Sequence, residues 1–368
     1  MNFFRKRVYA TAGYYTISMG TGRKEFNPKK QRPGIEDYIL EAGKGTLAQV
    51  ANPEAIDEGV MVGIKTILAD LADAVLVVGA EVQNSVKAVY GADYLAGAGW
   101  YKQRKEGHAH FFPGQFSDRA GVCFEKFGKQ KMREGMARWY VQAVENARLN
   151  PKAQEYHNAN EDLYATAMTT PNPKVFCEHI NVYDCSKVSD GASAIIFASE
   201  EGLKKLGVNK KDTAEVVSYG QCEDDITNPQ PDLTKMVTSQ KAASIAYERA
   251  GLTPKDIGVL EVHDCFSIAG LLMVEAMGFA KYGEAAEFVA MGKTKRDGEI
   301  PTNTTGGLIG YGHPVGATGV RQSADLVQQL IGKGECQISI DPNRPYGLMV
   351  SMGGNDITVV SMIFKKID

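Results

Sequence analysis

Near-continuous runs of apolar residues, many of them β-branched, recur along the chain and predict strands that are buried on both faces. These runs lie at residues 8–12, 60–63, 74–79, 193–198, 214–219, 259–263 and 357–364. Between them, apolar residues at helical spacing predict helices over residues 64–71, 239–250, 267–278 and 320–331. Gly251 is expected to end the helix over 239–250 as a C-terminal glycine. Strands that alternate with helices predict an α/β protein built in layers.

The stretch from residue 83 to residue 183 has a different pattern. It is rich in aromatic and charged residues, among them Trp100 and Trp139, and it is expected to be mostly helical or irregular. It contains too many large apolar side chains to stay in water as a linker. We therefore interpret it as an inserted subdomain.

A faint internal repeat links the two halves of the chain. Residues 57–63 (Asp-Glu-Gly-Val-Met-Val-Gly) resemble residues 256–262 (Asp-Ile-Gly-Val-Leu-Glu-Val), and the helix over 64–71 resembles the one that begins near Arg321. In the second copy the whole stretch 264–320 separates His263 from Arg321, whereas in the first copy strand and helix join directly between Gly63 and Ile64. The halves are thus predicted to be duplicates, of which the first lacks a loop.

Composition narrows the class of protein. With 368 residues, 43% of them hydrophobic, and 39 glycines, the chain is expected to form two or three compact domains. A formal net charge of −3 with no large basic cluster argues against nucleic acid as a partner. No apolar run reaches the roughly 20 residues that a membrane span needs.

The cysteines suggest the compartment. Six are present, with no CxxC pair and no metal-ligand spacing, so reduced thiols inside a cell are expected, without a metal site. The expected location is the cytoplasm, with the mitochondrion or the peroxisome as alternatives in a eukaryote.

His313 lies in a glycine-rich loop, between Gly312 and Pro314, just before a predicted helix. Glycines of this loop, such as Gly306, let the backbone approach a bulky ligand closely. A helix N-terminus favours the neutral imidazole, which suits a base that activates a nucleophile. A turn histidine satisfied by the backbone is an equal alternative on this pattern alone.

Residues 262–266 read Val-His-Asp-Cys-Phe and end a predicted buried strand, which is where ligands bind in α/β sheets. Cys265 could act as an acid or base if His263 or the helix start lowers its pKa. The commoner alternative is that Cys265 is a small buried apolar residue and His263 a capping residue.

A third motif, at residues 347–356, contains the adjacent glycines Gly353 and Gly354 ahead of the last predicted strand. Their backbone N–H groups could form an oxyanion hole. A plain glycine turn between two elements is the more common outcome for such a pattern.

Taken together, the three motifs resemble the thiolase superfamily, and the resemblance extends over nearly the whole chain. Residues 74–81 and 189–194 resemble two strands of the thiolase N-terminal domain. His-Asp-Cys-Phe at 263–266 is similar to the sterol-carrier-protein-type thiolases and their bacterial and archaeal acetyl-CoA acetyltransferase relatives. Ordinary thiolases have Asn-Glu-Ala-Phe there and a separate C-terminal cysteine, where this chain has Met352, Gly353 and Gly354.

The resemblance implies a thiolase fold: two duplicated domains in a five-layered αβαβα arrangement, with an inserted loop subdomain over the active site. We assign residues 1–82 and 184–208 to the N-terminal domain, 83–183 to the loop subdomain and 209–368 to the C-terminal domain. The resemblance also implies that coenzyme A and acyl-CoA are the substrates and that no cofactor is permanently bound. Homodimers or homotetramers are implied too, with a complex with another CoA enzyme as a further option.

By resemblance, His313 activates a nucleophilic cysteine, and Cys265 is the acid or base at the acyl carbon or the leaving thiolate. His263 helps to stabilise the enolate oxyanion, and the N–H of Gly354 faces the oxygen of the acyl-enzyme. Substrate-binding candidates are Ser239, beside the pantetheine, and Asn303 and Gly306 of the glycine-rich loop.

The chain departs from the family at the nucleophile. The family's nucleophilic cysteine follows a strand of the first half, in a glycine-rich loop that leads into a helix, which is the interval missing between Gly63 and Ile64. None of the six cysteines fits it. Either the natural protein has a further segment here or the chain is a shortened, non-catalytic homologue. We favour the first, because losing a strand and the start of a core helix would open the central sheet.

The function favoured by the sequence is a thiolase-type acyl-CoA C-acyltransferase. It would cleave a 3-oxoacyl-CoA with CoA, or run the reverse Claisen condensation, through an acyl-cysteine. The alternative is a non-catalytic thiolase-like subunit that binds CoA thioesters or acts as a scaffold. A ketoacyl synthase is disfavoured, because that relative typically uses two histidines in separate loops without the His-Asp-Cys-Phe thiol.

Overall fold

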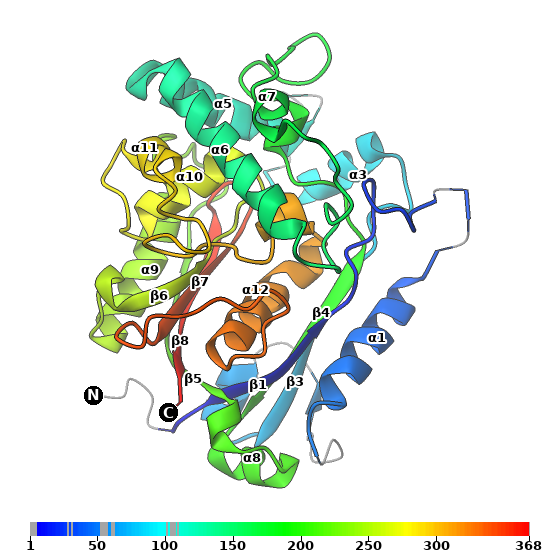
Figure 1. Cartoon of the computed structure of the whole chain (residues 1–368), viewed down its shortest axis with the longest axis vertical. Coiled ribbons are helices and arrows are strands. Elements are labelled where there is room, and N and C mark those ends of the chain that lie inside the picture. The colour runs from blue at the N-terminus through cyan, green and yellow to red at the C-terminus, as the bar shows by residue number, and fades with distance from the viewer. Residues whose placement is uncertain are drawn as a thin grey trace.

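The computed structural model describes residues 6–27, 29–30, 32–51, 58–59, 63–100, 102–103, 108 and 110–367. Within these residues the strands form one mixed sheet (Figure 1). The strands are β1 (Tyr9–Tyr15), β2 (Glu58–Gly59), β3 (Ala74–Glu81), β4 (Gly191–Ala198), β5 (Ala214–Glu223), β6 (Ile257–Glu261), β7 (Tyr346–Gly353) and β8 (Thr358–Lys366). The helices are α1 (Ile35–Leu47), α2 (Gly63–Leu68), α3 (Ala88–Leu95), α5 (Phe111–Phe127), α6 (Lys129–Ala147), α7 (Leu163–Ala167), α8 (Glu200–Leu206), α9 (Val237–Ala250), α10 (Ser267–Ala276), α11 (Ala285–Ala290) and α12 (Val315–Leu330).

The strand order, β2-β3-β4-β1-β5-β8-β7-β6, contains the same half-sheet twice. In the first half β2 and β3 are parallel, and the pairs β3–β4 and β4–β1 are antiparallel. In the second half β6 and β7 are parallel, and the pairs β7–β8 and β8–β5 are antiparallel. A short pairing of β1 with β5, at Tyr9↔Glu215 and Ala10↔Ala214, joins the halves. The duplication expected from the short repeat is confirmed.

The central strand of the first half shows how that half is covered. All residues of β4 are buried, and successive side chains point to opposite faces. Ala192 and Ala194 pack against Tyr38 and Ala42 of α1. The alternate residues of the same strand, Ile195 and Phe197, pack into a cluster that includes Leu326 and Val327 of α12. Helices α1 and α12 therefore cover opposite faces of this half-sheet.

The second half is covered in the same way. Val359 and Ile363 of β8 lie in the large cluster that contains α9 and α10, whereas Met362 and Phe364 lie in the cluster around α12. Helix α12 thus lies between the two half-sheets, as the orange helix in Figure 1 shows. The layers run α1, first half-sheet, α12, second half-sheet, then α9 and α10. The predicted α/β thiolase-type layering is confirmed.

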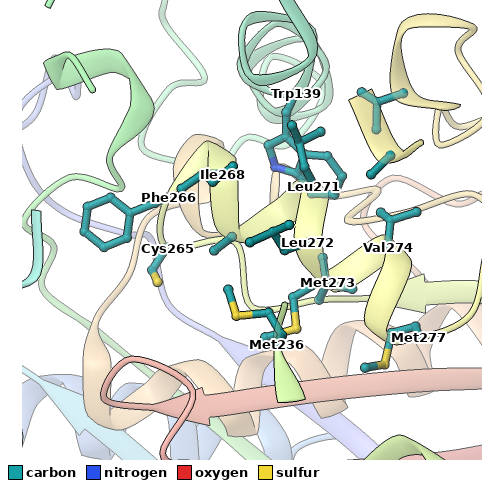
Figure 2. Packing of buried hydrophobic residues seen from close by; sticks show 14 of the residues in the cluster. Trp139, Met236, Cys265, Phe266, Ile268, Leu271, Leu272, Met273, Val274 and Met277 are labelled. Carbon is teal, nitrogen blue, oxygen red and sulfur yellow. The ribbon is translucent and has the colours of Figure 1, made fainter. Parts of the chain in front are cut away.

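Helices α5, α6 and α7 lie together at one end of the molecule, at the top of Figure 1. Helix α6 packs against α10 and α11 of the second half. Its buried Trp139 belongs to the core cluster shown in Figure 2. The inserted helices therefore share a core with the second half instead of standing apart from it.

Several predicted elements differ from the observed ones. The strand expected over 60–63 lies outside the described residues except for Gly63, which already begins α2. Strand β6 ends at Glu261, two residues earlier than expected, and α12 begins at Val315 instead of near residue 320. Strand β7 is not predicted by the sequence, because its glycines and methionines do not show a β-branched pattern. Helix α9 does end at Gly251, in a left-handed conformation (φ 67°), as predicted.

Candidate active site

The connection from β6 to α12 carries the candidate chemistry. It begins with the turn His263-Asp264-Cys265-Phe266, which leads into α10. The carboxylate of Asp264 is fully buried and fixes this turn: it accepts hydrogen bonds from Trp139 Nε1 of α6 (3.0 Å) and from the backbone N–H of Leu308 (2.7 Å). Burial raises the pKa of Asp264 to about 6, against the opposing effect of those hydrogen bonds. The turn is therefore tied both to the inserted helices and to the glycine-rich loop.

The two histidines meet although they lie far apart in the chain. The rings of His263 and His313 lie edge to face, with their centroids 5.1 Å apart and their planes at 87°. The backbone N–H of Met352, at the end of β7, donates to Nδ1 of His263 at 3.4 Å. This places the imidazole pair beside the turn that contains Gly354.

The loop that carries His313 is clamped by the first half of the molecule. The backbone N–H of His313 donates to the hydroxyl of Ser189 (3.0 Å), just before β4. Its carbonyl accepts from the side-chain amide of Gln83 (2.9 Å), which follows β3. The ring Nδ1 lies 2.6 Å from the hydroxyl of Thr318, in the first turns of α12. The first half therefore holds the backbone of His313, and α12 holds its ring.

Burial controls the charge of the site. It lowers the pKa of His313 to about 3, with a smaller contribution from the positive charge of Arg321. Burial, the neighbouring His313 and Arg321 hold the pKa of His263 well below its usual value. Both imidazoles are therefore neutral at pH 7. Burial, followed by the negative charge of Asp264, raises the pKa of the Cys265 thiol well above its usual value.

Cys265 lies at the edge of a packed apolar cluster. Figure 2 shows it beside Phe266, at the start of α10, with the methionines and leucines of that helix on the other side. Phe266 stacks on Phe116 of α5 at 4.3 Å between ring centroids. Cys265 is 6% exposed, and its environment keeps the thiol protonated. The sequence allows a lowered pKa here, but the desolvation at this position acts in the opposite direction.

Asn303 and Gly306 are held by protein groups. The side chain of Asn303 accepts from the N–H of Val262 (2.8 Å) and donates to the carbonyl of the same residue (3.1 Å), as a neighbouring strand would. Gly306 has φ 120°, and a Cβ on it would lie 2.8 Å from the backbone N of Tyr311. In this structure both residues shape the loop before the π-helical turn Gly307–Tyr311.

Ser239 is also fully engaged. Its hydroxyl donates to Oδ1 of Asp356 (2.5 Å), and its backbone N–H donates to the same oxygen (2.9 Å). The other carboxylate oxygen of Asp356 accepts from the N–H of Thr238 (2.9 Å). These bonds cap the N-terminus of α9 and tie it to the turn after β7. Ser239 is completely buried, and among the described residues no hydrogen bond joins it to His263 or His313.

A pocket of about 210 Å³ opens beside Gly354. It is lined by the segment before α5, by α5, by the loop between β5 and α9, and by the turn Gly354-Asn355. Trp100 and Phe112 give it an apolar wall, and Gln230 lines it with both amide atoms buried and without a partner among the described residues. Arg119, also buried, holds the turn in place through Asn355 Oδ1 (2.9 and 3.1 Å). Gly354 has φ 69°, so a glycine suits this turn.

Several residues of the site are not singled out by the sequence. Trp139 and Gln83 lie far from the motifs in the chain, and no local pattern connects them with the site. Thr318 and Arg321 are three residues apart near the start of α12, the helix that follows His313, so the register of that helix could have indicated that they share a face. Arg321 is buried, pairs with Asp325 through Nη1 and leaves Nε and Nη2 without a hydrogen-bond partner in the described part of the chain.

Metal sites and membrane spans are both absent from the described part of the molecule. No group of three His, Cys, Asp or Glu side chains in that part of the chain could hold a metal ion. None of the helices described is both long and apolar enough to cross a membrane. All six cysteines are free thiols.

Comparison with known proteins identifies the class to which this fold and site belong. The family described as "Thiolase C-terminal domain-like" matches residues 221–366. The chain is 31% identical over 304 residues to acetyl-CoA acetyltransferase of Methanocaldococcus jannaschii, covering 82% of this chain and 71% of that protein. The chain therefore belongs to the thiolase family.

Other relatives are matched over smaller parts of their length. Acetyl-CoA acetyltransferase of Methanothermobacter thermautotrophicus is 34% identical over 258 residues, which are 69% of this chain and 63% of that protein. Human sterol carrier protein 2 is 36% identical over 207 residues, 55% of this chain and 37% of that protein.

Solved structures show the same fold at low sequence identity. Human mitochondrial 3-ketoacyl-CoA thiolase has a TM-score of 0.69 at 18% identity, with 99% of each chain covered. The Ltp2-ChsH2(DUF35) aldolase has a TM-score of 0.77, also at 18% identity, with 98% of each chain covered.

Proposed function

We propose that the protein is a thiolase-type acyl-CoA C-acyltransferase, which cleaves a 3-oxoacyl-CoA with CoA or runs the reverse Claisen condensation. The observation that carries the proposal is the edge-to-face pair of His263 and His313 near the Gly354 turn, with Cys265 two residues after His263 in the same turn. Its membership in the thiolase family, with relatives named acetyl-CoA acetyltransferase, supports the substrate class. A CoA complex of human mitochondrial 3-ketoacyl-CoA thiolase shares the fold, with a TM-score of 0.68.

The charge states of the site fit the roles that we propose. A neutral His313 can take the proton of a nucleophilic cysteine thiol, which then attacks the 3-oxo carbon of the substrate. When the bond between C2 and C3 breaks, the protonated thiol of Cys265 can supply the proton that C2 needs. His263 accepts the N–H of Met352 at Nδ1, so its Nε2–H is available to donate to the enolate oxygen.

We propose that the nucleophile comes from a segment between β2 and α2 that the present sequence lacks. Only residues 60–62 connect these elements. At the equivalent place in the second half, residues 262–314 connect β6 with α12 and contain all the candidate catalytic side chains. None of the six cysteines follows a first-half strand and precedes a helix in the way the family's nucleophile does.

The decisive experiment is the intact mass of the protein purified from its natural source, with peptide mapping across Gly59 to Lys65. A mass above 39.9 kDa by the equivalent of about 40 residues, with a cysteine in the added peptide that becomes acylated by acetyl-CoA, supports the proposal. A mass of 39.9 kDa with no acyl adduct and no thiolysis of acetoacetyl-CoA overturns it in favour of a non-catalytic subunit that binds CoA thioesters.

The fold alone does not fix the reaction, because one of the solved structures with this fold is an aldolase. If the purified protein cleaved a 3-hydroxyacyl-CoA but not a 3-oxoacyl-CoA, the acyltransferase proposal would be wrong.

For the pocket beside Gly354 we propose the CoA thioester as occupant, since Gln230 can pair with an amide of the ligand. Replacing Gln230 by Leu should then raise KM for the thioester with little effect on kcat.

The oligomeric state, the location and the domain boundaries of the protein are also proposals. We propose a homodimer or homotetramer in the cytoplasm, and domain boundaries near residues 83, 184 and 209. Light scattering on the purified protein tests the first, and limited proteolysis with mass mapping tests the boundaries. Co-purification from the natural source tests a complex with another CoA enzyme.

A further inference from the structure

The imidazole of His313 is held through Nδ1 by the hydroxyl of Thr318, at 2.6 Å. The same hydroxyl lies 3.0 Å from the carbonyl oxygen of Pro314, four residues earlier, in the back-bonding geometry common for threonine in helices. Thr318 itself is buried, and so is its bond to the Pro314 carbonyl.

A threonine hydroxyl has one proton, and this settles how the two bonds can be made. If the hydroxyl donated to Nδ1, its contact with the Pro314 carbonyl would bring two acceptors together. If it donates to the carbonyl instead, its lone pair can accept from Nδ1–H, and both contacts become hydrogen bonds. The second arrangement requires the proton of His313 to be on Nδ1.

We propose that Thr318 is a positioning residue that keeps His313 in the Nδ1–H tautomer, so that Nε2 carries the lone pair. This inference rests on the proposed role of His313 as the base that takes the proton of the nucleophile. The ring atom that Thr318 does not contact is then the one that can accept a proton.

The facing histidine is held in the opposite tautomer. Nδ1 of His263 accepts from the backbone N–H of Met352, so the proton of His263 is on Nε2. Both rings are neutral because desolvation lowers the pKa of each, of the buried His263 and of the half-buried His313, so their difference is not one of charge. Two neighbouring imidazoles thus present different groups, a lone pair on His313 and an N–H on His263. Thr318 and the Met352 backbone make this difference.

The tautomer can be measured on the chain as it stands, without turnover. The chain has six histidines, so selective ¹⁵N-histidine labelling gives a readable two-dimensional spectrum, in which His313→Gln identifies the signals of His313. At pH 7.5 the wild-type protein should show a protonated Nδ1 and an unprotonated Nε2 for His313. Thr318→Val should lose this pattern and shift the Nε2 signal toward the protonated position, whereas Thr318→Ser should restore it.

Ser323→Ala is the matched control, because Ser323 makes the same bond to the carbonyl four residues earlier (Gly319, 2.9 Å) in the same helix without touching a histidine. It should leave the His313 signals unchanged. A wild-type spectrum with the proton on Nε2 overturns the inference even if Thr318→Val fails to fold, and so does a folded Thr318→Val protein with wild-type signals.

In enzyme that contains the nucleophile, Thr318→Val should lower kcat by about 10- to 100-fold with little change in KM, and Thr318→Ser should recover most of it. The two proposals can fail separately. If His313 carries its proton on Nδ1 but the protein shows no thiolysis, the positioning role of Thr318 is supported and the acyltransferase proposal is wrong. If the protein shows thiolysis but His313 carries its proton on Nε2, the acyltransferase proposal is supported and the positioning role is wrong.

Discussion

The two halves of the molecule have the same strand topology but very different connections at the equivalent place. In the second half, residues 262–314 run from β6 to α12, and they form the buried turn with Cys265, the glycine-rich loop and the loop of His313. In the first half, only residues 60–62 run from β2 to α2. Helix α12 (Val315–Leu330) packs on both half-sheets, whereas α2 is the short helix Gly63–Leu68.

The difference shows that the scaffold and the chemistry of this fold are separable. The first half keeps its strand pairing and its packing on α1 without carrying any candidate nucleophile in its described residues. It still serves the site, because Gln83 and Ser189 hold the backbone of His313. Among the described residues, the second half thus carries the candidate catalytic side chains, and the first half helps to position one of them.

The largest expected effect tests whether residues 262–314, which connect β6 with α12, carry the catalytic side chains. In enzyme that contains the nucleophile, His313→Gln should lower thiolysis of acetoacetyl-CoA by about 10²- to 10⁴-fold, because the base is lost. Cys265→Ala should abolish turnover in the same assay. His157→Gln is the control, since His157 lies outside the site and faces Glu25 at 3.8 Å. Near-wild-type rates in either site variant would contradict the assigned role.

The next effect concerns the buried carboxylate of the same connection. Because the pKa of Asp264 is raised from 3.8 to about 6 in the folded protein, the folded state binds this proton more tightly than the unfolded state. Its contribution to stability is therefore fully present below about pH 4 and is lost as the pH rises through 6. The loss corresponds to about 3 kcal/mol in the free energy of unfolding.

Urea unfolding of the wild type and of Asp264→Asn between pH 4.5 and 7.5 measures this effect. The difference between the two free energies should fall as the pH rises, since asparagine does not titrate. A difference that stays constant would show that the hydrogen bonds from Trp139 and Leu308 balance the burial, and one that grows with pH would show that they outweigh it.

A smaller effect probes the contact between the halves. A Cβ on Gly79 of β3 would lie 2.3 Å from the carbonyl oxygen of Gly316, in the first turn of α12. Gly79→Ala should therefore push α12 away and cost about 1–3 kcal/mol in the free energy of unfolding. Gly43→Ala in α1, where a Cβ meets nothing within 4 Å, should instead stabilise the protein by about 0.5–1 kcal/mol. Equal effects of the two substitutions would mean that the halves do not meet so closely.

The smallest effect tests the clamp on the His313 loop. Ser189→Ala removes the acceptor of the His313 N–H and the donor to Gln154 (2.6 Å), which should cost about 0.5–1.5 kcal/mol. In active enzyme kcat should fall more than KM changes, because the loop loses its position and not its side chain. An unchanged kcat in a destabilised variant would mean that the clamp serves only folding.

Much of the fold could be predicted from the sequence where a local pattern existed. The strands over 74–79, 193–198, 214–219 and 357–364 are recognisable because continuous β-branched runs mark strands buried on both faces. The repeat at 57 and 256 is recognisable from its similar residues, and in the structure β2 and β6 occupy equivalent edge positions. Strand β7 and helix α1 are not predicted. The glycines and methionines of β7 and the mixed apolar pattern of α1 both give weak local signals.

The candidate site was predictable in parts. His263, Cys265 and His313 could be named from their motifs. The distance between the two imidazole rings could not be predicted, because a long stretch of chain separates the two histidines. Ser239 and Asn303 were expected at the substrate. In the structure their side chains bond Asp356 and Val262. Sequence spacing does not tell whether a polar side chain satisfies the protein or faces a ligand.

The sequence by itself determined the family, the layers and the lack of a nucleophile between the first repeated strand and its helix, because each of these depends on residue types in local order. Only the tertiary structure decided that Cys265 is a protonated thiol, that the two imidazoles are neutral and face each other, and that Thr318 contacts one of them. These properties depend on burial and on contacts between distant segments, which desolvate a charge or fix a proton, and no local pattern encodes them.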